Sequence, residues 1–131
     1  MDSPSDIAMQ GFDALYGLRL IEFDDVVARG EVAVRDELKQ PRGLVHGGVY
    51  ASLAESLCSL ATAFAVESEG RQVTGQSNTT SFLRPVTAGT IHATARARHR
   101  GRTMWVWEVD FTDDEGRLCA LTRMTVAVFD R

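Results

Sequence analysis

The stretch GLVHGGVYASLAESLCS, residues 43–59, decides how the rest of this chain is organised. A glycine-rich turn leads directly into a helix of small residues that carries one carboxylate, Glu55. The first backbone N–H groups of a helix lack partners within the helix, and the helix dipole adds partial positive charge there. The turn is therefore suited to stabilising an oxyanion or a polarised carbonyl. The helix carries either a reactive site or only a tightly packed core face with a solvated acid.

The composition of the 131 residues is that of a single globular domain covering residues 1–131. A formal net charge of −4 gives no reason to expect nucleic acid as a partner. Cys58 and Cys119 lack C-x-x-C or metal-ligand spacing, so we expect reduced core thiols in a cytoplasmic protein. The N-terminus has no secretory signal pattern, and no apolar run is expected to be long enough to cross a membrane.

The hydrophobic pattern predicts an α+β fold. We expect a loose tail over residues 1–10, a short helical turn over 11–17, and strand-like alternation over 18–38 with a turn at Asp24 and Asp25. Residues 48–67 form the one long predicted helix, closed by Gly70. Four predicted strands follow: VTGQSNTTSFLRPV (73–86), TIHATARARHR (90–100), TMWVWEVDFT (103–112) and RLCALTRMTVAVF (117–129). This order favours a curved antiparallel sheet wrapped around one central helix.

The predicted helix has two faces. Its apolar stripe is Val49, Leu53, Leu57, Leu60 and Phe64, and its polar stripe is Ser52, Glu55, Ser59 and Thr62. Glu55 and Ser59 are four residues apart, so the hydroxyl can reach the carboxylate or a water molecule bound to it. Spacing alone favours a solvated helix face. The alanine-rich surroundings favour a partly desolvated carboxylate that acts as a base or nucleophile.

The turn before the helix contains His46, Gly47 and Gly48. It is not a phosphate-binding P-loop, because no Gly-Lys-Ser/Thr follows. One interpretation is a simple tight turn, and the other is an oxyanion hole made by the Gly47 N–H. At about 1.5 Å per residue, Gly47 and Glu55 are about 12 Å apart along the helix. One carbonyl cannot contact both in one subunit, so if both act, two chains must share the site.

Four further sequence patterns bear on function. Arg96, Arg98 and Arg100 indicate a solvated sheet face more than a phosphate site, and Arg84 at a strand end is the better single candidate for phosphate. The alternating Trp105, Trp107, Val109 and Phe111 indicate core packing. No pair of histidines has metal-ligand spacing, so no metal is predicted. No serine lies in a G-x-S-x-G elbow, which disfavours a serine hydrolase.

The quoted residues resemble a known family. LKQPRGLVHGGVYASLAES (38–56), VTGQSNTTSFLRPV (73–86) and GRTMWVWEVDFTDDEGRLCALTRMTVAV (101–128) are similar to hotdog-fold acyl-CoA thioesterases. The likeness covers about residues 38–129. It is strongest to the 4-hydroxybenzoyl-CoA thioesterases that use a helix glutamate, within the phenylacetate-pathway thioesterase group. The resemblance implies the hotdog fold, in which a curved sheet surrounds a central helix.

The resemblance also implies roles for catalytic residues. Glu55 matches the carboxylate that attacks the thioester or activates water, and Gly47 matches the glycine whose N–H polarises the thioester carbonyl. Gln40 matches a glutamine that hydrogen-bonds near that carbonyl. His46 matches the histidine of the HGG motif. Ser59 stands where the family has a threonine that orients the carboxylate or water, so the hydroxyl is kept and the methyl group is not.

Coenzyme A contacts follow from the same resemblance. Arg84 matches a residue that contacts the CoA nucleotide, and Arg102 and Thr103 stand where the family has a Ser-Thr pair near that phosphate. Enzymes of this kind form homodimers with shared active sites, commonly paired again into homotetramers. They need no metal and no cofactor, since CoA is part of the substrate.

The sequence therefore predicts an acyl-CoA thioesterase acting on an aromatic acyl group such as 4-hydroxybenzoyl. Medium-chain or carrier-protein acyl thioesters are alternative substrates. A hotdog dehydratase or hydratase would show a His/Asp pattern on the helix, which the sequence does not have. A non-catalytic acyl-CoA-binding module would keep Arg84 and tolerate the loss of Glu55.

Overall fold

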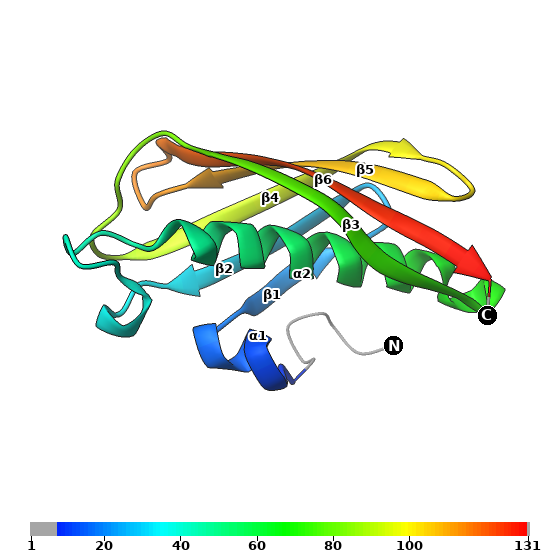
Figure 1. The fold of residues 1–131 in the computed structure, drawn as a ribbon, viewed down its shortest axis with the longest axis horizontal. Helices are drawn as coiled ribbons and strands as arrows, with labels where there is room; N and C mark the ends of the chain where they lie inside the picture. Colours follow the sequence, from blue (N-terminus) through cyan, green and yellow to red (C-terminus); the bar gives the residue numbers. More distant parts are fainter. Residues whose placement is uncertain (1–7, 131) are drawn as a thin grey trace.

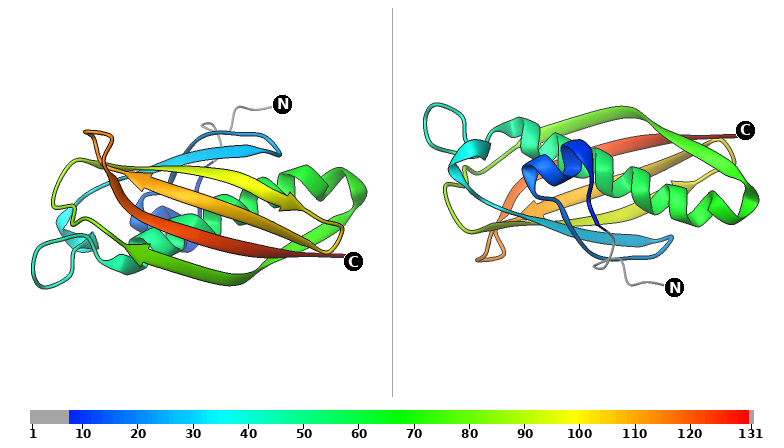
Figure 2. Two further views of the ribbon diagram at one scale, coloured as in Figure 1. Left: turned by 90° about the horizontal axis from the view of Figure 1, so that it is seen from above. Right: turned by 90° about the horizontal axis from the view of Figure 1, so that it is seen from below.

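The computed structural model describes residues 8–130 and contains one sheet, two α-helices and two short 3-10 helices. In chain order these are α1 (Gly11–Tyr16), β1 (Arg19–Phe23), β2 (Val27–Ala33), η2 (Asp36–Leu38), α2 (Gly47–Val66), η3 (Glu67–Glu69), β3 (Arg71–Phe82), β4 (Thr90–Arg100), β5 (Met104–Thr112) and β6 (Leu118–Asp130). The six strands pair antiparallel in the order β1-β2-β4-β5-β6-β3. The sheet curves over α2, and α1 lies on the other side of α2 (Figures 1 and 2). The predicted sheet around one central helix is confirmed.

Most element boundaries follow the local sequence signals. The turn predicted at Asp24 joins β1 to β2, and its carboxylate accepts hydrogen bonds from the Val26 and Val27 N–H groups. Gly70 adopts a left-handed φ of 70° and ends η3, which continues α2. The strand-like interpretation of residues 18–38 is wrong at its end, because residues 36–38 form a 3-10 turn. The predicted loose tail over residues 1–10 lies mostly outside the described residues.

The core fills the space between the concave face of the sheet and α2. Trp107, Phe111, Leu53 and Leu57 are fully buried there, which confirms the predicted core face of β5. The predicted polar stripe of α2 is wrong at Thr62, which is also fully buried. Its hydroxyl donates to the Cys58 carbonyl (2.7 Å) and accepts from the indole N–H of Trp107 (2.9 Å). These two hydrogen bonds satisfy the buried hydroxyl and explain why a polar residue is tolerated in the core.

The apolar stripe of α2 is only partly covered. Phe64, at its C-terminal end, keeps 38% of its surface exposed, and Leu60 is half-buried. Phe64 packs edge-on against Phe23 of β1, with ring centroids 4.9 Å apart. The sheet edge made by β1 therefore leaves one side of the last turns of the helix partly exposed, at Leu60 and Phe64.

Strand β3 forms one edge of the sheet and lies beside α2. It is 12 residues long and most of its residues are exposed. A bulge between Gly75 and Ser77 interrupts its pairing with β6. A Cβ atom at Gly75 would lie 2.9 Å from the Met124 methyl and 3.4 Å from the Glu55 side chain, so glycine lets β3 approach the helix here. The free edge of β3 and the Glu55 face of α2 are thus neighbours.

Segment Gly47–Glu69 is long and apolar enough to cross a membrane by length and composition, contrary to the expectation from the sequence. Half of its most apolar 18-residue window is buried inside the structure. As the central helix of this fold, it belongs to the core and is not a membrane span.

Candidate active site

The first turn of α2 leaves one backbone donor open. His46 is the N-cap residue, and its Nδ1 atom accepts a hydrogen bond from the Gly48 N–H at 2.8 Å. The Val49 N–H bonds to the His46 carbonyl at 3.0 Å. The Gly47 N–H has no hydrogen-bond partner among residues 8–130. The helix start therefore presents a single free donor, at the position predicted for an oxyanion contact.

The N-cap hydrogen bond also determines the tautomer of the neutral His46 ring. A nitrogen that accepts a hydrogen bond carries no proton, so the neutral ring holds its proton on Nε2. The side chain is exposed. The Nε2–H group is consequently a second potential donor next to the Gly47 N–H.

The loop before α2 is held in place by backbone hydrogen bonds on both sides. The Val45 N–H donates to the Val86 carbonyl at 2.8 Å, and the His46 N–H donates to the Leu38 carbonyl at 2.9 Å. Within the loop, the Gln40 side-chain carbonyl accepts from the Arg42 N–H. This contact uses the oxygen of the Gln40 amide and leaves its NH₂ group available to a substrate carbonyl.

Phe82, at the end of β3, covers the glycine at the helix start. A Cβ atom at Gly47 would lie 2.6 Å from the Phe82 ring, closer than real Cβ contacts allow. A side chain at position 47 would therefore have to displace the exposed Phe82 ring. The sequence pattern did not single out Phe82, although its place two residues before Arg84 put it near the end of the predicted strand.

Four predicted site residues line one cavity of about 480 Å³: Gln40, His46, Gly47 and Arg84. Arg84 is exposed and makes no ion pair with another described residue. Tyr50 lines the same cavity, and its buried hydroxyl has no hydrogen-bond partner in the described part of the chain. Burial raises the pKa of Tyr50 to about 12, so the hydroxyl stays protonated at neutral pH. The cavity therefore combines several uncommitted donors with one free cation.

Glu55 lies two turns further along α2 and is not part of this cavity. The Glu55 side chain is exposed in the single chain. The prediction that neighbouring alanines partly desolvate its carboxylate is therefore wrong for one subunit by itself. Glu55 contacts β3 next to Gly75, and no hydrogen bond joins it to Ser59 among the described residues. Nearby, the Asn78 amide donates to the Ala51 carbonyl at 2.9 Å and ties β3 to the helix. Within one chain, Glu55 and Gly47 therefore lie in separate places along α2, as the helical rise per residue predicted.

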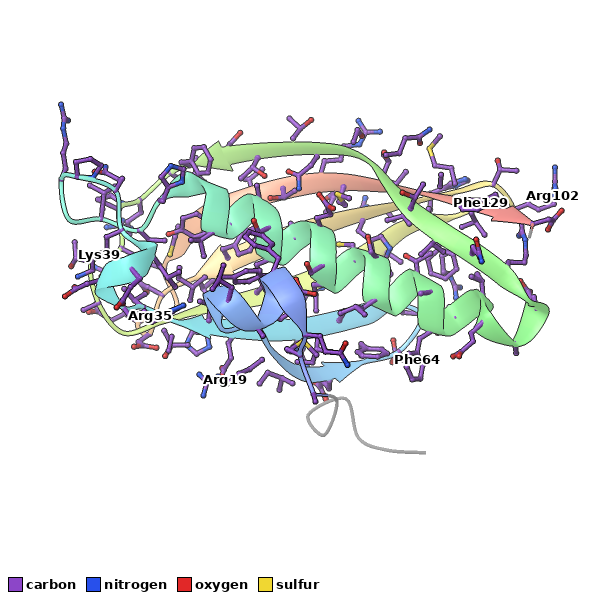
Figure 3. The ribbon with its side chains drawn as sticks, turned by 60° about the horizontal axis from the view of Figure 1, so that its bottom comes forward. Arg19, Arg35, Lys39, Phe64, Arg102 and Phe129 are labelled. Carbon is purple, nitrogen blue, oxygen red and sulfur yellow. The ribbon has the colours of Figure 1, made fainter. Side chains whose placement is uncertain are left out.

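Arg102 and Thr103 lie at the opposite end of α2 from Gly47. Arg102 lines a polar cavity of about 430 Å³ with Glu69, next to the C-terminal end of the helix. Figure 3 shows Arg102 at one end of the molecule and Lys39, beside the Gly47 loop, at the other. Within one chain the structure does not bring Arg102 near Arg84.

Two arginines of β4 and one histidine form surface ion pairs. Arg98 pairs with Glu108 (3.6 Å) and Arg100 with Asp25 (2.5 Å), which supports the solvated-face interpretation for both arginines. His92 bonds through Nε2 to Asp114 at 2.8 Å. Among residues 8–130 no group of three or more His, Cys, Asp or Glu side chains could hold a metal ion.

The comparisons with known proteins identify the family of this chain. A family model described as the Thioesterase superfamily matches residues 42–120. The chain belongs to the Thioesterase superfamily. The matched segment runs from the loop before α2 into β6, so it spans the Gly47 turn, Glu55 and Arg84.

Three relatives of this thioesterase-superfamily chain illustrate the likeness. The Mycobacterium tuberculosis protein "Putative esterase Rv1847" is 41% identical over 91% of this chain and 87% of the relative. Its solved structure has a TM-score of 0.88 at 38% identity and covers 92% of this chain and 97% of that one. The Staphylococcus aureus thioesterase SAV0944 has a TM-score of 0.85 at 26% identity over 89% of this chain and 97% of that one. A 1,4-dihydroxy-2-naphthoyl-CoA hydrolase from Listeria monocytogenes is 32% identical over 90% of this chain and 95% of the relative.

The hotdog fold implied by the sequence resemblance is confirmed by this structural similarity. The chain is an enzyme of the thioesterase type, a hydrolase of acyl-CoA thioesters. The sequence patterns did not point to Phe82 or Tyr50 as site residues. In the structure Phe82 packs against Gly47, and Tyr50 lines the same cavity.

Proposed function

We propose that this thioesterase hydrolyses aromatic acyl-CoA at the start of α2, with Gly47 polarising the thioester carbonyl. The observation that carries the proposal is the single unpartnered N–H at Gly47, in one cavity with Gln40 and Arg84. A backbone donor that is held in place before the reaction stabilises the oxyanion of a tetrahedral intermediate. The free amide NH₂ of Gln40 supplies a second donor, and the Arg84 guanidinium faces the CoA phosphates.

Glu55 of a second subunit supplies the attacking or activating carboxylate. In one course its oxygen attacks the carbonyl carbon, CoA thiolate leaves and takes a proton, and water then hydrolyses the mixed anhydride. In the other course Glu55 takes a proton from the water that attacks the carbonyl directly. Both courses remain open. Single turnover in ¹⁸O-labelled water separates them, since only the anhydride course can place label in the Glu55 carboxylate.

Two-fold symmetry fixes how two such subunits must meet. If Gly47 of each chain lies beside Glu55 of its partner, the contact is reciprocal, and the two α2 helices must run antiparallel. The symmetry axis then passes near residue 51, midway between the two positions. In the structure the Ala51 carbonyl is bonded to Asn78, near the middle of β3. The β3 strands of two subunits could pair antiparallel about that point, which is compatible with the same two-fold axis. This pairing would cover the long open edge of each β3 strand.

The same arrangement accounts for Arg102 and Thr103. In the partner subunit, α2 continues for 11 residues beyond Glu55 to its end at Val66. This is a length of about 16 Å at the usual helical rise. The end of this partner helix therefore lies beyond the Gly47 turn of the first subunit, on the side where the CoA arm leaves the thioester. We propose that Arg102 and Thr103 of one subunit and Arg84 of the other contact the nucleotide end of one CoA.

Two relatives support these assignments. Structures of S. aureus SAV0944 exist with a glutamate-to-alanine and a glutamine-to-alanine replacement, at positions 15 residues apart. Gln40 and Glu55 have the same separation here. The Listeria relative is named for a naphthoyl-CoA substrate, which favours an aromatic acyl group, whether a 4-hydroxybenzoyl or a larger ring system.

The first test is thioester hydrolysis by Glu55→Gln and Glu55→Ala, followed by release of the CoA thiol. We expect kcat to fall by about 10²–10⁴-fold, because the base or nucleophile is lost. Glu67→Gln, at an exposed glutamate beyond the end of the same helix, should be unaffected. Full activity in Glu55→Ala would exclude the catalytic role and favour a binding module. A panel of benzoyl-, hydroxybenzoyl-, naphthoyl-, fatty acyl-CoA and acyl-carrier-protein thioesters defines the substrate.

The second test asks whether two chains share each site. Gln40→Ala and Glu55→Ala subunits are each inactive, but a mixed dimer contains one site with both residues intact. Mixing the two variants after unfolding and refolding should restore about a quarter of wild-type activity if dimers form at random. If both residues act within one chain, no mixture recovers activity.

A further inference from the structure

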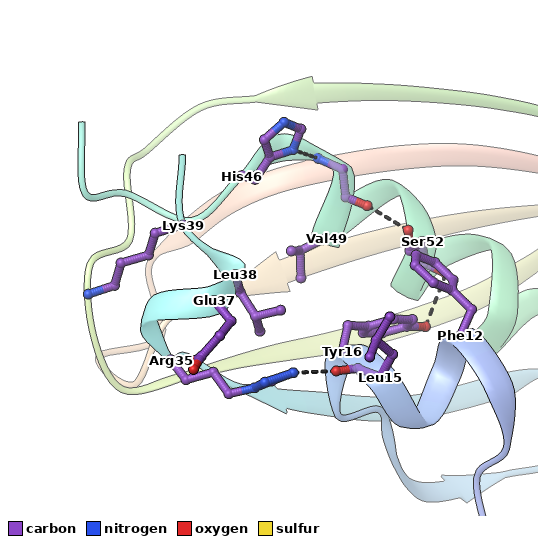
Figure 4. Close-up of a pocket in the computed structure, with 11 residues that line it drawn as sticks. Phe12, Leu15, Tyr16, Arg35, Glu37, Leu38, Lys39, His46, Val49 and Ser52 are labelled. Atoms are coloured by element: carbon purple, nitrogen blue, oxygen red, sulfur yellow. Dashed lines mark hydrogen bonds between the residues drawn. The ribbon is translucent and has the colours of Figure 1, made fainter. Parts of the chain in front are cut away.

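A second and larger cavity lies on the other side of the helix start. It has a volume of about 630 Å³ and is enclosed by α1, η2 and the first turns of α2 (Figure 4). Its apolar wall consists of Phe12, Leu15, Leu38 and Val49. His46 and Gly48 line both this α1 cavity and the Gly47 cavity. The free N–H of Gly47 therefore lies where the two cavities meet.

Most polar groups of the α1 cavity already have partners among the described residues, and one exception is the Nε2–H of His46, which also borders the Gly47 cavity. The Tyr16 hydroxyl donates to Asp13 (3.2 Å), and the Ser52 hydroxyl donates to the Gly48 carbonyl (2.7 Å). Arg35 donates to the Leu15 carbonyl, and Lys39 pairs with Asp36. The remaining charged side chain, Glu37, is exposed to solvent. A ligand entering this cavity finds mainly apolar surface, so an uncharged and apolar group is favoured.

The lining of the Gly47 cavity is also mostly apolar, but this cavity differs in carrying polar groups that have no partners among the described residues. Its Gln40 amide NH₂, Arg84 guanidinium and Tyr50 hydroxyl are not used by other described residues. A substrate thioester held at Gly47 has one anionic arm that is rich in carbonyl groups and one acyl arm. Matching polar groups to polar groups directs the CoA arm to the Gly47 cavity and the acyl arm to the α1 cavity.

Helix α1 is fixed against α2, so its apolar side chains are held in place. The Asp13 carboxylate accepts from both the Tyr16 hydroxyl and the Ser56 hydroxyl of α2 (2.6 Å). Beside this anchor, Phe12 and Leu15 remain 62% and 70% exposed. The rings of Phe12 and Tyr16 are tilted at 59° with centroids 5.2 Å apart, an arrangement to which another ring can pack edge to face.

We propose that the α1 cavity receives the acyl group and that Phe12 and Leu15 determine which acyl groups are hydrolysed. They favour an uncharged aromatic ring over a short aliphatic chain. This inference rests on the proposed thioesterase function and assigns its substrate selection to a helix outside the sequence stretch that carries the family resemblance.

The test compares kcat/KM for benzoyl-CoA with kcat/KM for acetyl-CoA, whose acyl group is too short to fill the cavity. We expect Phe12→Ala and Leu15→Ala each to lower the benzoyl-to-acetyl ratio about tenfold, because contacts with the ring are lost. Phe129→Ala removes an equally large exposed ring at the far end of the molecule and should leave the ratio unchanged (Figure 3). Leu83→Ala, in the Gly47 cavity, tests the reverse assignment of the two arms.

An unchanged ratio in both α1 variants overturns the proposal, as does a ratio that falls in Leu83→Ala but not in Leu15→Ala. Binding measurements separate this inference from the proposed function. Calorimetric titration of wild type, Phe12→Ala and Leu15→Ala with benzoyl-CoA and with CoA requires no turnover. A benzoyl contribution to affinity that is lost in the α1 variants supports the proposal even if Glu55→Ala stays active. An equal benzoyl contribution in all three proteins contradicts it even if Glu55 proves catalytic.

Discussion

The buried contact between Thr62 and Trp107 allows a quantitative test of the core. Both side chains are fully buried, and the indole N–H donates to the Thr62 hydroxyl at 2.9 Å. Thr62→Val keeps the shape but leaves the indole N–H without an acceptor. A buried polar group that loses its partner costs about 1–3 kcal/mol. We therefore expect the free energy of unfolding to fall by about 2 kcal/mol, with a fall in Tm of roughly 8 °C for a domain of this size.

The assay is thermal and urea unfolding at one fixed protein concentration, since a dimer makes Tm concentration-dependent. Thr125→Val is the matched control, because the Thr125 hydroxyl bonds to one partner among residues 8–130, the Ser77 hydroxyl at an exposed position. This change should alter stability by less than about 0.5 kcal/mol. Trp107→Phe removes the donor, so Thr62→Val should cost much less in that background. A Thr62→Val variant as stable as Thr125→Val, or an equal cost in both backgrounds, would refute the hydrogen-bond account.

Three further outcomes are expected. Gly47→Ala retains the N–H but displaces Phe82, so its kcat/KM should fall about tenfold and recover in part when Phe82→Ala is added, as a double-mutant cycle would show. Arg84→Ala should raise KM for acyl-CoA about fivefold with little change in kcat, and the effect should shrink as salt is raised. The hydrogen bond from His92 holds the pKa of Asp114 below its ordinary value, so its stabilising effect is present above about pH 4 and is lost as the pH falls further. Asp114→Asn should accordingly be less stable than wild type at pH 6 and approach it at pH 3, measured by urea unfolding; a constant difference across that range would contradict the linkage.

Local sequence determined the elements of this protein. The proline-containing loop and glycines at 47 and 48 mark the start of α2, Gly70 ends its 3-10 extension, and the alternating apolar residues of 103–112 define a strand with one buried face. Such signals depend on backbone conformation and on a repeat of two or 3.6 residues, which neighbouring positions in the chain specify. The separation of Gly47 and Glu55 was likewise available from the sequence, since helical rise is fixed.

Tertiary structure alone decided which side chains share a space. Thr62 belongs to a polar stripe by spacing, yet it is buried because Trp107 of β5 provides a hydrogen-bond partner across the core. Phe82 covers Gly47 although 35 residues separate them, and α1 encloses a cavity although its sequence lies outside the recognised family pattern. Contacts of this kind depend on how the curved sheet and the helix pack in three dimensions, and no local repeat encodes them. The opening stretch therefore specified a helix whose start carries a free backbone donor. The surrounding fold placed two cavities beside that start, and one of them holds polar groups that other described residues leave unpaired, those of Gln40, Tyr50 and Arg84.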